Sequence, residues 1–356
     1  MMLALVPFLI IYFWGSIAVI GIIYHLFSKI SGIKKIDYLA VSLLVSPTFI
    51  SVILYYLLLL LPNQASSFYI FFIVGLLLFM IFANQKKIRQ LQLFNFSSFS
   101  FTNIRATIKN HGEINFVLMV YLFLITLLLI INSSVNDHDW YEYGALGKNF
   151  YNGLKVGYDQ VRYYPQNGFY FIGLHGFAVP LFKTFEALCN DIFNYKSDLY
   201  FRSISYIQNY ILFFWIVIRL SNKSALAAFI FIIILVFNVQ AFSTIYALNS
   251  IDPIRISLIM VVLFTLYITQ GDMYKIAPMI FGFLAGIAAF VHSLSMLMML
   301  GMLGLIIFFN LIKYKNLKSF TFACKLLLFF FASGVLHYIL DLTIGTGWIF
   351  QNIKFY

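Results

Sequence analysis

Three acids and a histidine lie close together at one place in a strongly apolar chain. In the stretch SSVNDHDWYEYG, Asp137, His138, Asp139 and Glu142 follow eighteen almost purely apolar residues. Acids at the start of a helix can cap its free N–H groups and complement its dipole, and one acid is enough for that. The cluster holds more acid than a cap requires, so Asp137, Asp139 and Glu142 are also candidates for chemistry.

The residues after this cluster have the spacing of an amphipathic helix. The apolar and small residues of one face are Tyr143, Leu146, Gly147, Phe150, Tyr151 and Leu154. They recur at intervals of three and four, while Glu142, Lys148, Asn149 and Asn152 fall elsewhere on the helix. We therefore expect a helix on the membrane surface that presents the acids near its first turn.

The composition is that of a membrane protein. Of 356 residues, 62% are hydrophobic and 10% are charged, against roughly 25% charged in soluble domains. A bilayer core needs ~20 apolar residues per helix, and backbone groups in hydrocarbon must pair within the segment. We predict an all-α polytopic fold with about ten spans, at residues 3–27, 38–61, 68–83, 114–131, 203–219, 225–245, 256–270, 276–292, 294–312 and 320–340.

The basic residues indicate how these spans are oriented. Fourteen of the 23 Lys and Arg residues lie in five short loops, which the positive-inside rule assigns to the cytoplasm. Ten spans satisfy all five loops if the chain starts outside. The net charge of +11 is then a topology signal, and no nucleic-acid partner is expected. The first span lacks a basic n-region and a cleavage site, so we expect it to be retained.

The same orientation predicts one large external loop, residues 132–202. It requires that the apolar stretch 168–182 does not cross the membrane, and its Gly173, Gly176 and Pro180 favour an interfacial or re-entrant helix. We divide the chain into an N-terminal three-helix segment with a cytoplasmic loop, 1–113, and a transmembrane core, 114–356.

Several stretches in this order resemble the integral-membrane GT-C glycosyltransferases. They are an acid just outside a membrane helix, a Tyr-containing amphipathic helix, RYYPQNGFYFIGLHGF in place of a Pro-rich motif, and Arg202 at the next span. ALNSIDPIR, with Asp252, and FGFLAGIAAFVHSLSML, with His292, follow at matching places. The resemblance covers about residues 114–345, and the chain lacks the adjacent Asp-Glu pair and the double proline common in that family.

This resemblance implies a transferase of the bacterial inner membrane that acts on its periplasmic or extracellular side. The donor would be a polyprenyl-phosphate sugar, and the acceptor a glycan, lipid or protein. Asp139, or else Asp137, would be the base that takes the acceptor's proton, with inversion at the sugar. Arg202 and Arg162 would hold the phosphate, although either could anchor at the interface. The other candidate substrate-binding residues are Glu142, Tyr143, His292 and Asp252.

The histidines leave the question of a metal open. His138, His175, His292 and His337 fall on or near the predicted external side, but no HxxH or HExxH spacing is present. We expect no cofactor; a divalent metal is conceivable without support from spacing. Other function classes fit the composition as well: an O-antigen or polysaccharide polymerase or ligase, a transporter, or a non-catalytic membrane subunit. The near absence of ionisable residues within the spans argues against ion-coupled transport.

Overall fold

A computed structural model of the chain describes residues 6–7, 9–27, 30, 32–91, 113–132, 138–156, 177–192, 199–237, 252–269, 278–314 and 317–339. Every regular element within these ranges is a helix, as the composition predicts. The helices of the first half are η1 (Leu9–Gly15, a π-helical turn), α2 (Ser16–Phe27), α3 (Lys35–Leu60), α4 (Ser66–Gln90), α6 (Glu113–Asn132), α7 (His138–Gly153) and α9 (Ala178–Asn190). Those of the second half are α10 (Leu199–Ser221), α11 (Ala225–Phe237), α13 (Asp252–Ile268), α14 (Pro278–Val291), α15 (Ser293–Tyr314), α16 (Leu317–Phe330) and the π-helical η4 (Phe331–Val335).

Five segments are long and apolar enough to cross a membrane. They are Leu9–Phe27, Lys35–Leu60, Ser66–Gln90, Ser293–Ile312 and Ser319–Ile339. Shorter apolar helices coincide with the other five predicted spans, at Asn115–Leu124, Tyr206–Ser221, Ala225–Ile234, Ile254–Ile268 and Pro278–Val291. These apolar stretches are shorter than the ~20 residues that a bilayer core needs, although the helices α6 and α10 that contain two of them have 20 and 23 residues. The helical fold is therefore confirmed, with five helices long and apolar enough to span a membrane, and the count of ten spans stays a prediction.

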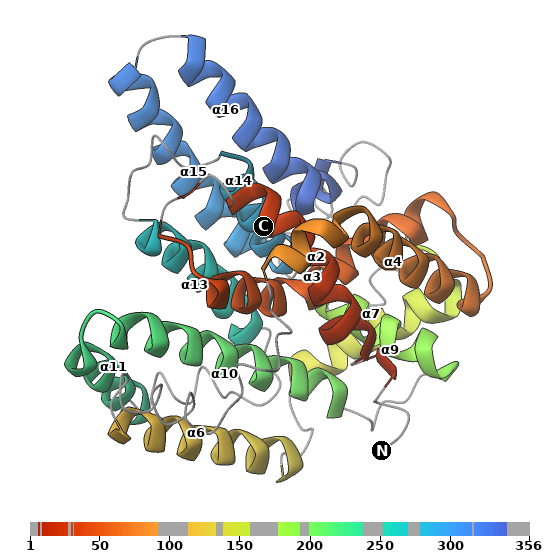
Figure 1. The fold of residues 1–356 in the computed structure, drawn as a ribbon. Helices are drawn as coiled ribbons and strands as arrows, with labels where there is room; N and C mark the ends of the chain where they lie inside the picture. The colour runs from red at the N-terminus through yellow and green to blue at the C-terminus, as the bar shows by residue number, and fades with distance from the viewer. Residues whose placement is uncertain are drawn as a thin grey trace.

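Helix α3 is the central element of the bundle. It packs against α2, α9, α10 and α14, and Figure 1 shows it surrounded by helices from distant parts of the sequence. Helices α6 and α10 run side by side at one edge, while α14, α15 and α16 form the opposite part. One hydrophobic core joins α3 to helices on both sides of residue 113, so the division at 113/114 remains a prediction about the sequence.

Polar contacts tie several helix ends together at the start of α3, which we call the Asp37 end. Arg219, near the end of α10, forms an ion pair with Asp37. Lys87 of α4 lies 2.9 Å from His25 of α2, between Nζ and Nδ1. Asn115 Nδ2, at the start of α6, donates to the Ala225 carbonyl at the start of α11. The basic loops around residues 34, 87 and 219 thus gather at one end, as the charge pattern predicts.

The other end of α3, which we call the Leu60 end, lies about 39 Å away along this 26-residue helix. The connection from α3 to α4 contacts the segment that follows α7 here. Asn63 N donates to the Leu154 carbonyl over 2.8 Å, and Val156 N donates to the Leu58 carbonyl over 3.4 Å. The amphipathic helix predicted for the external loop therefore lies at the end opposite to the basic loops.

Helices α14 and α16 pack so closely that their glycines are required. A Cβ on Gly282 would collide with the Leu326 carbonyl, and one on Gly286 would collide with the Phe330 carbonyl. Gly334 lies directly against the backbone of Gly286. Gly282 and Gly286 form a GxxxG pattern, which here serves close helix packing.

Candidate functional site

The apolar face predicted for α7 is buried, and it is another part of the protein that covers it. Tyr143, Leu146 and Phe150 are at most 3% exposed, and Asn152 on the other face is exposed. Their partner is α9 rather than the membrane surface that we expected. The physical reason is that α9 offers a continuous buried face, residues 178–188, which covers the apolar side of α7.

Gly147 allows the two helices to approach each other. A Cβ there would stand 2.8 Å from both the Pro180 carbonyl oxygen and Lys183 Cβ, which is closer than real Cβ contacts. Thr184 Oγ1 donates to the Gly147 carbonyl over 3.1 Å. Pro180 lies inside the first turn of α9, where its missing N–H costs nothing. Contact between backbones fixes the position of α7 on α9.

The end of α7 is fastened to the transmembrane helices through Tyr69 of α4. The Tyr69 hydroxyl lies 2.8 Å from the Leu61 carbonyl and 3.0 Å from the Leu154 carbonyl, and it accepts from Gln64 N. The single hydroxyl proton is shared between the two carbonyls. Leu154 adopts a positive φ of 44°, which turns the chain into this contact. Tyr69 therefore links the end of α7 to the α3–α4 connection.

Helix α9 enters the bundle from the Leu60 end. Its 13 residues are too few to span a bilayer, as predicted for this part of the loop. Its first residue, Ala178, has its carbonyl 3.5 Å from Ser51 Oγ of α3. Ser51 precedes Leu60 by nine residues, about 13 Å along the helix. This depth agrees with the re-entrant alternative; residues 168–176 lie outside the described residues.

An aromatic cluster receives the inserted start of α9. The Phe177 ring lies 5.5 Å from those of Tyr55 and His337, and Phe290 lies 4.9 Å from His337. His337 is 1% exposed, and its Nδ1 donates to the Gly334 carbonyl. Its Nε2 has no hydrogen-bond partner among the described residues. His337 was predicted on or near the external side, and no sequence pattern predicted this cluster.

The predicted catalytic acids belong to the start of this assembly. Asp139 and Glu142 lie in the first turns of α7, and their side chains are outside the described ones. Asp137 and Arg162 lie outside the described residues altogether. Asp139 precedes Phe150 by eleven residues, so the two are about 16 Å apart along the helix. The contacts of Leu154 place the C-terminal end of α7 at the Leu60 end, and Asp139 lies fifteen residues earlier, about 22 Å along the helix.

The remaining predicted substrate-binding residues are distributed over three helices. Arg202 lies near the start of α10 and Asp252 begins α13; the side chains of both are outside the described ones. Tyr143 is buried on the face of α7 that meets α9. His292 joins α14 to α15, is 8% exposed, and accepts a hydrogen bond from Leu294 N through Nδ1. This bond caps α15, and the binding roles of all four stay predictions.

Titratable groups around α7 and α9 are shifted by burial. Burial raises the pKa of the Tyr151 hydroxyl, and the charge and hydrogen bond of the nearby Asp191 raise it further. Burial also raises the pKa of the Cys189 thiol far above its usual range, with a contribution from Glu186. Both groups are neutral at physiological pH and act here as packing groups. Within the described residues, no three His, Cys, Asp or Glu side chains come together in a way that could hold a metal ion.

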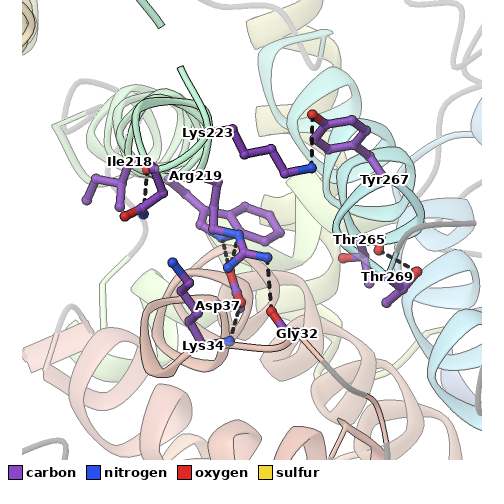
Figure 2. A network of polar contacts seen from close by, with 11 residues as sticks. Gly32, Lys34, Asp37, Ile218, Arg219, Lys223, Thr265, Tyr267 and Thr269 are labelled. Atoms are coloured by element: carbon purple, nitrogen blue, oxygen red, sulfur yellow. Dashed lines mark hydrogen bonds and ion pairs between the residues drawn. The ribbon is translucent and has the colours of Figure 1, made fainter. Parts of the chain in front are cut away.

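A second polar cluster, at the Asp37 end, went unnoticed in the sequence (Figure 2). Asp37 is fully buried, and its Oδ1 accepts from Trp215 Nε1 over 2.7 Å and lies 3.4 Å from Arg219 Nε. Its Oδ2 accepts from Lys34 N over 2.6 Å. The available signal was an acid directly before the predicted span 38–61, since a charge at the edge of a span needs a partner when it is buried.

Comparison of the chain with protein-family models, with curated proteins and with solved structures finds no match. The GT-C resemblance therefore stands on the sequence stretches that suggested it.

Proposed function

We propose that this protein is a membrane glycosyltransferase that moves a sugar from a polyprenyl-phosphate donor to an acceptor hydroxyl at the Leu60 end. The observation that carries the proposal is the anchoring of α7, whose first turns contain Asp139 and Glu142. Its buried face and the contacts of Leu154 fix this helix on the bundle. A general base requires such a fixed position relative to its substrate.

The distribution of charge supports placing the reaction on the outer face. Basic residues gather at the Asp37 end, which the positive-inside rule assigns to the cytoplasm. The acid-bearing helix α7 lies at the opposite end of α3. A lipid-linked sugar keeps its phosphate at the headgroup level, so a carboxylate next to a membrane helix can reach the reacting atoms.

In the proposed reaction, the acceptor oxygen attacks the anomeric carbon while the Asp139 carboxylate takes the hydroxyl proton. The bond between the anomeric carbon and the phosphate oxygen breaks, and polyprenyl phosphate leaves with the electron pair. The sugar configuration inverts. The leaving phosphate gains negative charge, which Arg202 or Arg162 would stabilise with a bidentate guanidinium. Asp137 is the alternative base.

The decisive experiment supplies purified protein with a panel of polyprenyl-phosphate sugars and acceptor extracts and measures transfer. We expect transfer from at least one donor, and Asp139→Asn should lower its rate by ~10²–10⁴-fold because Asn caps a helix but accepts no proton. Asn152→Ala, on the exposed side of the same helix, is the control and should keep the rate.

Three outcomes are informative against this proposal. If Asp137→Asn abolishes transfer and Asp139→Asn does not, the base is two residues earlier. If both variants keep full activity, the acids are structural and the proposed mechanism is wrong. Chain extension of a lipid-linked glycan, without single-sugar transfer, would favour the alternative of a polysaccharide polymerase or ligase.

A further inference from the structure

The Asp37 end carries three cationic residues, Lys34, Arg219 and Lys223, at the start of α3 and the end of α10. Arg219 is 9% exposed, and its guanidinium is oriented by Asp37 and by the Gly32 carbonyl, which accepts from Nη2 over 3.1 Å. Gly32 has a positive φ of 86°, which a glycine adopts without strain and which directs this carbonyl. The other terminal nitrogen of Arg219, Nη1, makes no hydrogen bond within the part of the chain that the structure describes.

Lys223 is the next cationic residue after Arg219 along the chain. It follows Arg219 by four residues, and turn hydrogen bonds from Asn222 N to the Ile218 carbonyl and from Lys223 N to the Leu220 carbonyl continue the end of α10. Residues four apart on a helix lie on the same side. The Lys223 ammonium is 3.4 Å from the Tyr267 hydroxyl of α13 and 4.6 Å from its ring centre. Lys223 is exposed yet directed by this contact.

Lys34 completes the group from the side of α3. Its backbone N–H donates to Asp37 Oδ2, and Asp37 Oδ1 meets Arg219, so the backbone of Lys34 is held two contacts from the guanidinium. The Lys34 side chain is exposed. Figure 2 shows Lys34, Arg219 and Lys223 around the same end of the bundle, from two helix ends. Of these three cations, only Arg219 brings its charge to the carboxylate of Asp37, so the group keeps a net charge of +2.

We propose that Lys34, Arg219 and Lys223 bind the phosphate group of an anionic lipid headgroup at the Asp37 end. A guanidinium held in a fixed orientation with two flanking ammonium groups matches a phosphate. Basic groups between helices at a cytoplasmic membrane face recognise anionic headgroups in this way. The site is independent of the proposed transfer reaction, which concerns the Leu60 end.

The test measures thermal unfolding of the detergent-purified protein during titration with short-chain phosphatidylglycerol. We expect Tm to rise with half-saturation at a defined lipid concentration. Short-chain phosphatidylcholine, whose choline cancels the phosphate charge, should give a much smaller shift. Inorganic phosphate at the same concentrations is the third arm, and an equal shift with it would overturn the assignment to a lipid headgroup.

Substitution locates the site. Each lysine near a lipid phosphate contributes about fivefold in affinity, so Lys34→Gln with Lys223→Gln should raise the half-saturating concentration by about 25-fold. The matched control is Lys86→Gln with Arg89→Gln, which removes the same charge from exposed residues of α4 at the same end. Each single lysine variant should raise the half-saturating lipid concentration about fivefold. The single variants keep the test available if the double variant does not fold. Equal effects of the two double variants would overturn the proposal.

Discussion

The Asp37 end and the Leu60 end of the bundle use different chemistry to hold their helices. At the Asp37 end a buried carboxylate joins α3 to α10 through Trp215 and Arg219. At the Leu60 end the described contacts are aromatic packing around Phe177 and hydrogen bonds to the carbonyls of Leu58 and Leu154. At the Asp37 end, charged groups hold α3 and α10 together. At the Leu60 end, backbone contacts and aromatic packing position the helix that carries the acids.

Removing Asp37 should produce the largest stability loss at either end. Asp37→Ala leaves Arg219 buried without its partner and costs about 3–5 kcal/mol of unfolding free energy. Unfolding of the purified variant in detergent measures this. The double variant Asp37→Leu with Arg219→Met removes both charges and should lose clearly less. A double variant at least as unstable as the single one would show that the ion pair is not what joins α3 to α10.

Crowding the contact of α7 with α9 should produce the next largest effect. Gly147→Val forces side-chain atoms against the Pro180 carbonyl and Lys183, so α7 must shift, at a cost of about 1–3 kcal/mol. Thermal unfolding and sugar transfer should both decline. Gly75→Val is the matched control, because a Cβ at Gly75 meets nothing within 4 Å. Equal losses in the two variants would argue against close packing at Gly147.

Loss of the Tyr69 hydroxyl should have the smallest effect of the three. Tyr69→Phe removes the hydrogen bonds to the Leu61 and Leu154 carbonyls and costs about 1 kcal/mol. Faster hydrogen exchange at residues 154–156 would report the loosened contact. Tyr121→Phe, at a tyrosine that is 52% exposed, should leave this exchange unchanged. An unaltered exchange rate in the Tyr69 variant would mean that its hydroxyl does not fasten the end of α7.

Local patterns predicted part of this structure from sequence. The 3.6-residue period identified the buried face of α7, Tyr143 to Phe150, because that face is determined within one helix. The basic residues predicted which helix ends gather together, since Lys87 and Arg219 lie in the last turns of their helices and Lys223 directly follows α10. Pro180 and its neighbouring glycines indicated that residues 168–182 do not span; helix α9 includes only 178–182 of this stretch, so this stays a prediction.

Long-range pairing was not predictable from the sequence. Asp37 meets Trp215 and Arg219, about 180 residues later, and no periodicity links them. The partner of the α7 face was also hidden, because an apolar stripe fits a bilayer surface as well as another helix. The aromatic cluster at His337 depends on the insertion of Phe177 between α3 and α14, which is a property of packing alone.

The proposed transfer on the outer face requires that the Leu60 end and the Asp37 end face opposite sides of the membrane. Asn152→Cys on α7 and Asn222→Cys after α10 place a single reactive thiol at the Leu60 end and the Asp37 end, at exposed positions. Intact cells expressing each variant, with Cys189 and Cys324 replaced by Ser, are treated with a membrane-impermeant maleimide. We expect labelling at position 152 in intact cells and at position 222 only after the membrane is opened. Labelling of position 222 from outside would contradict this orientation.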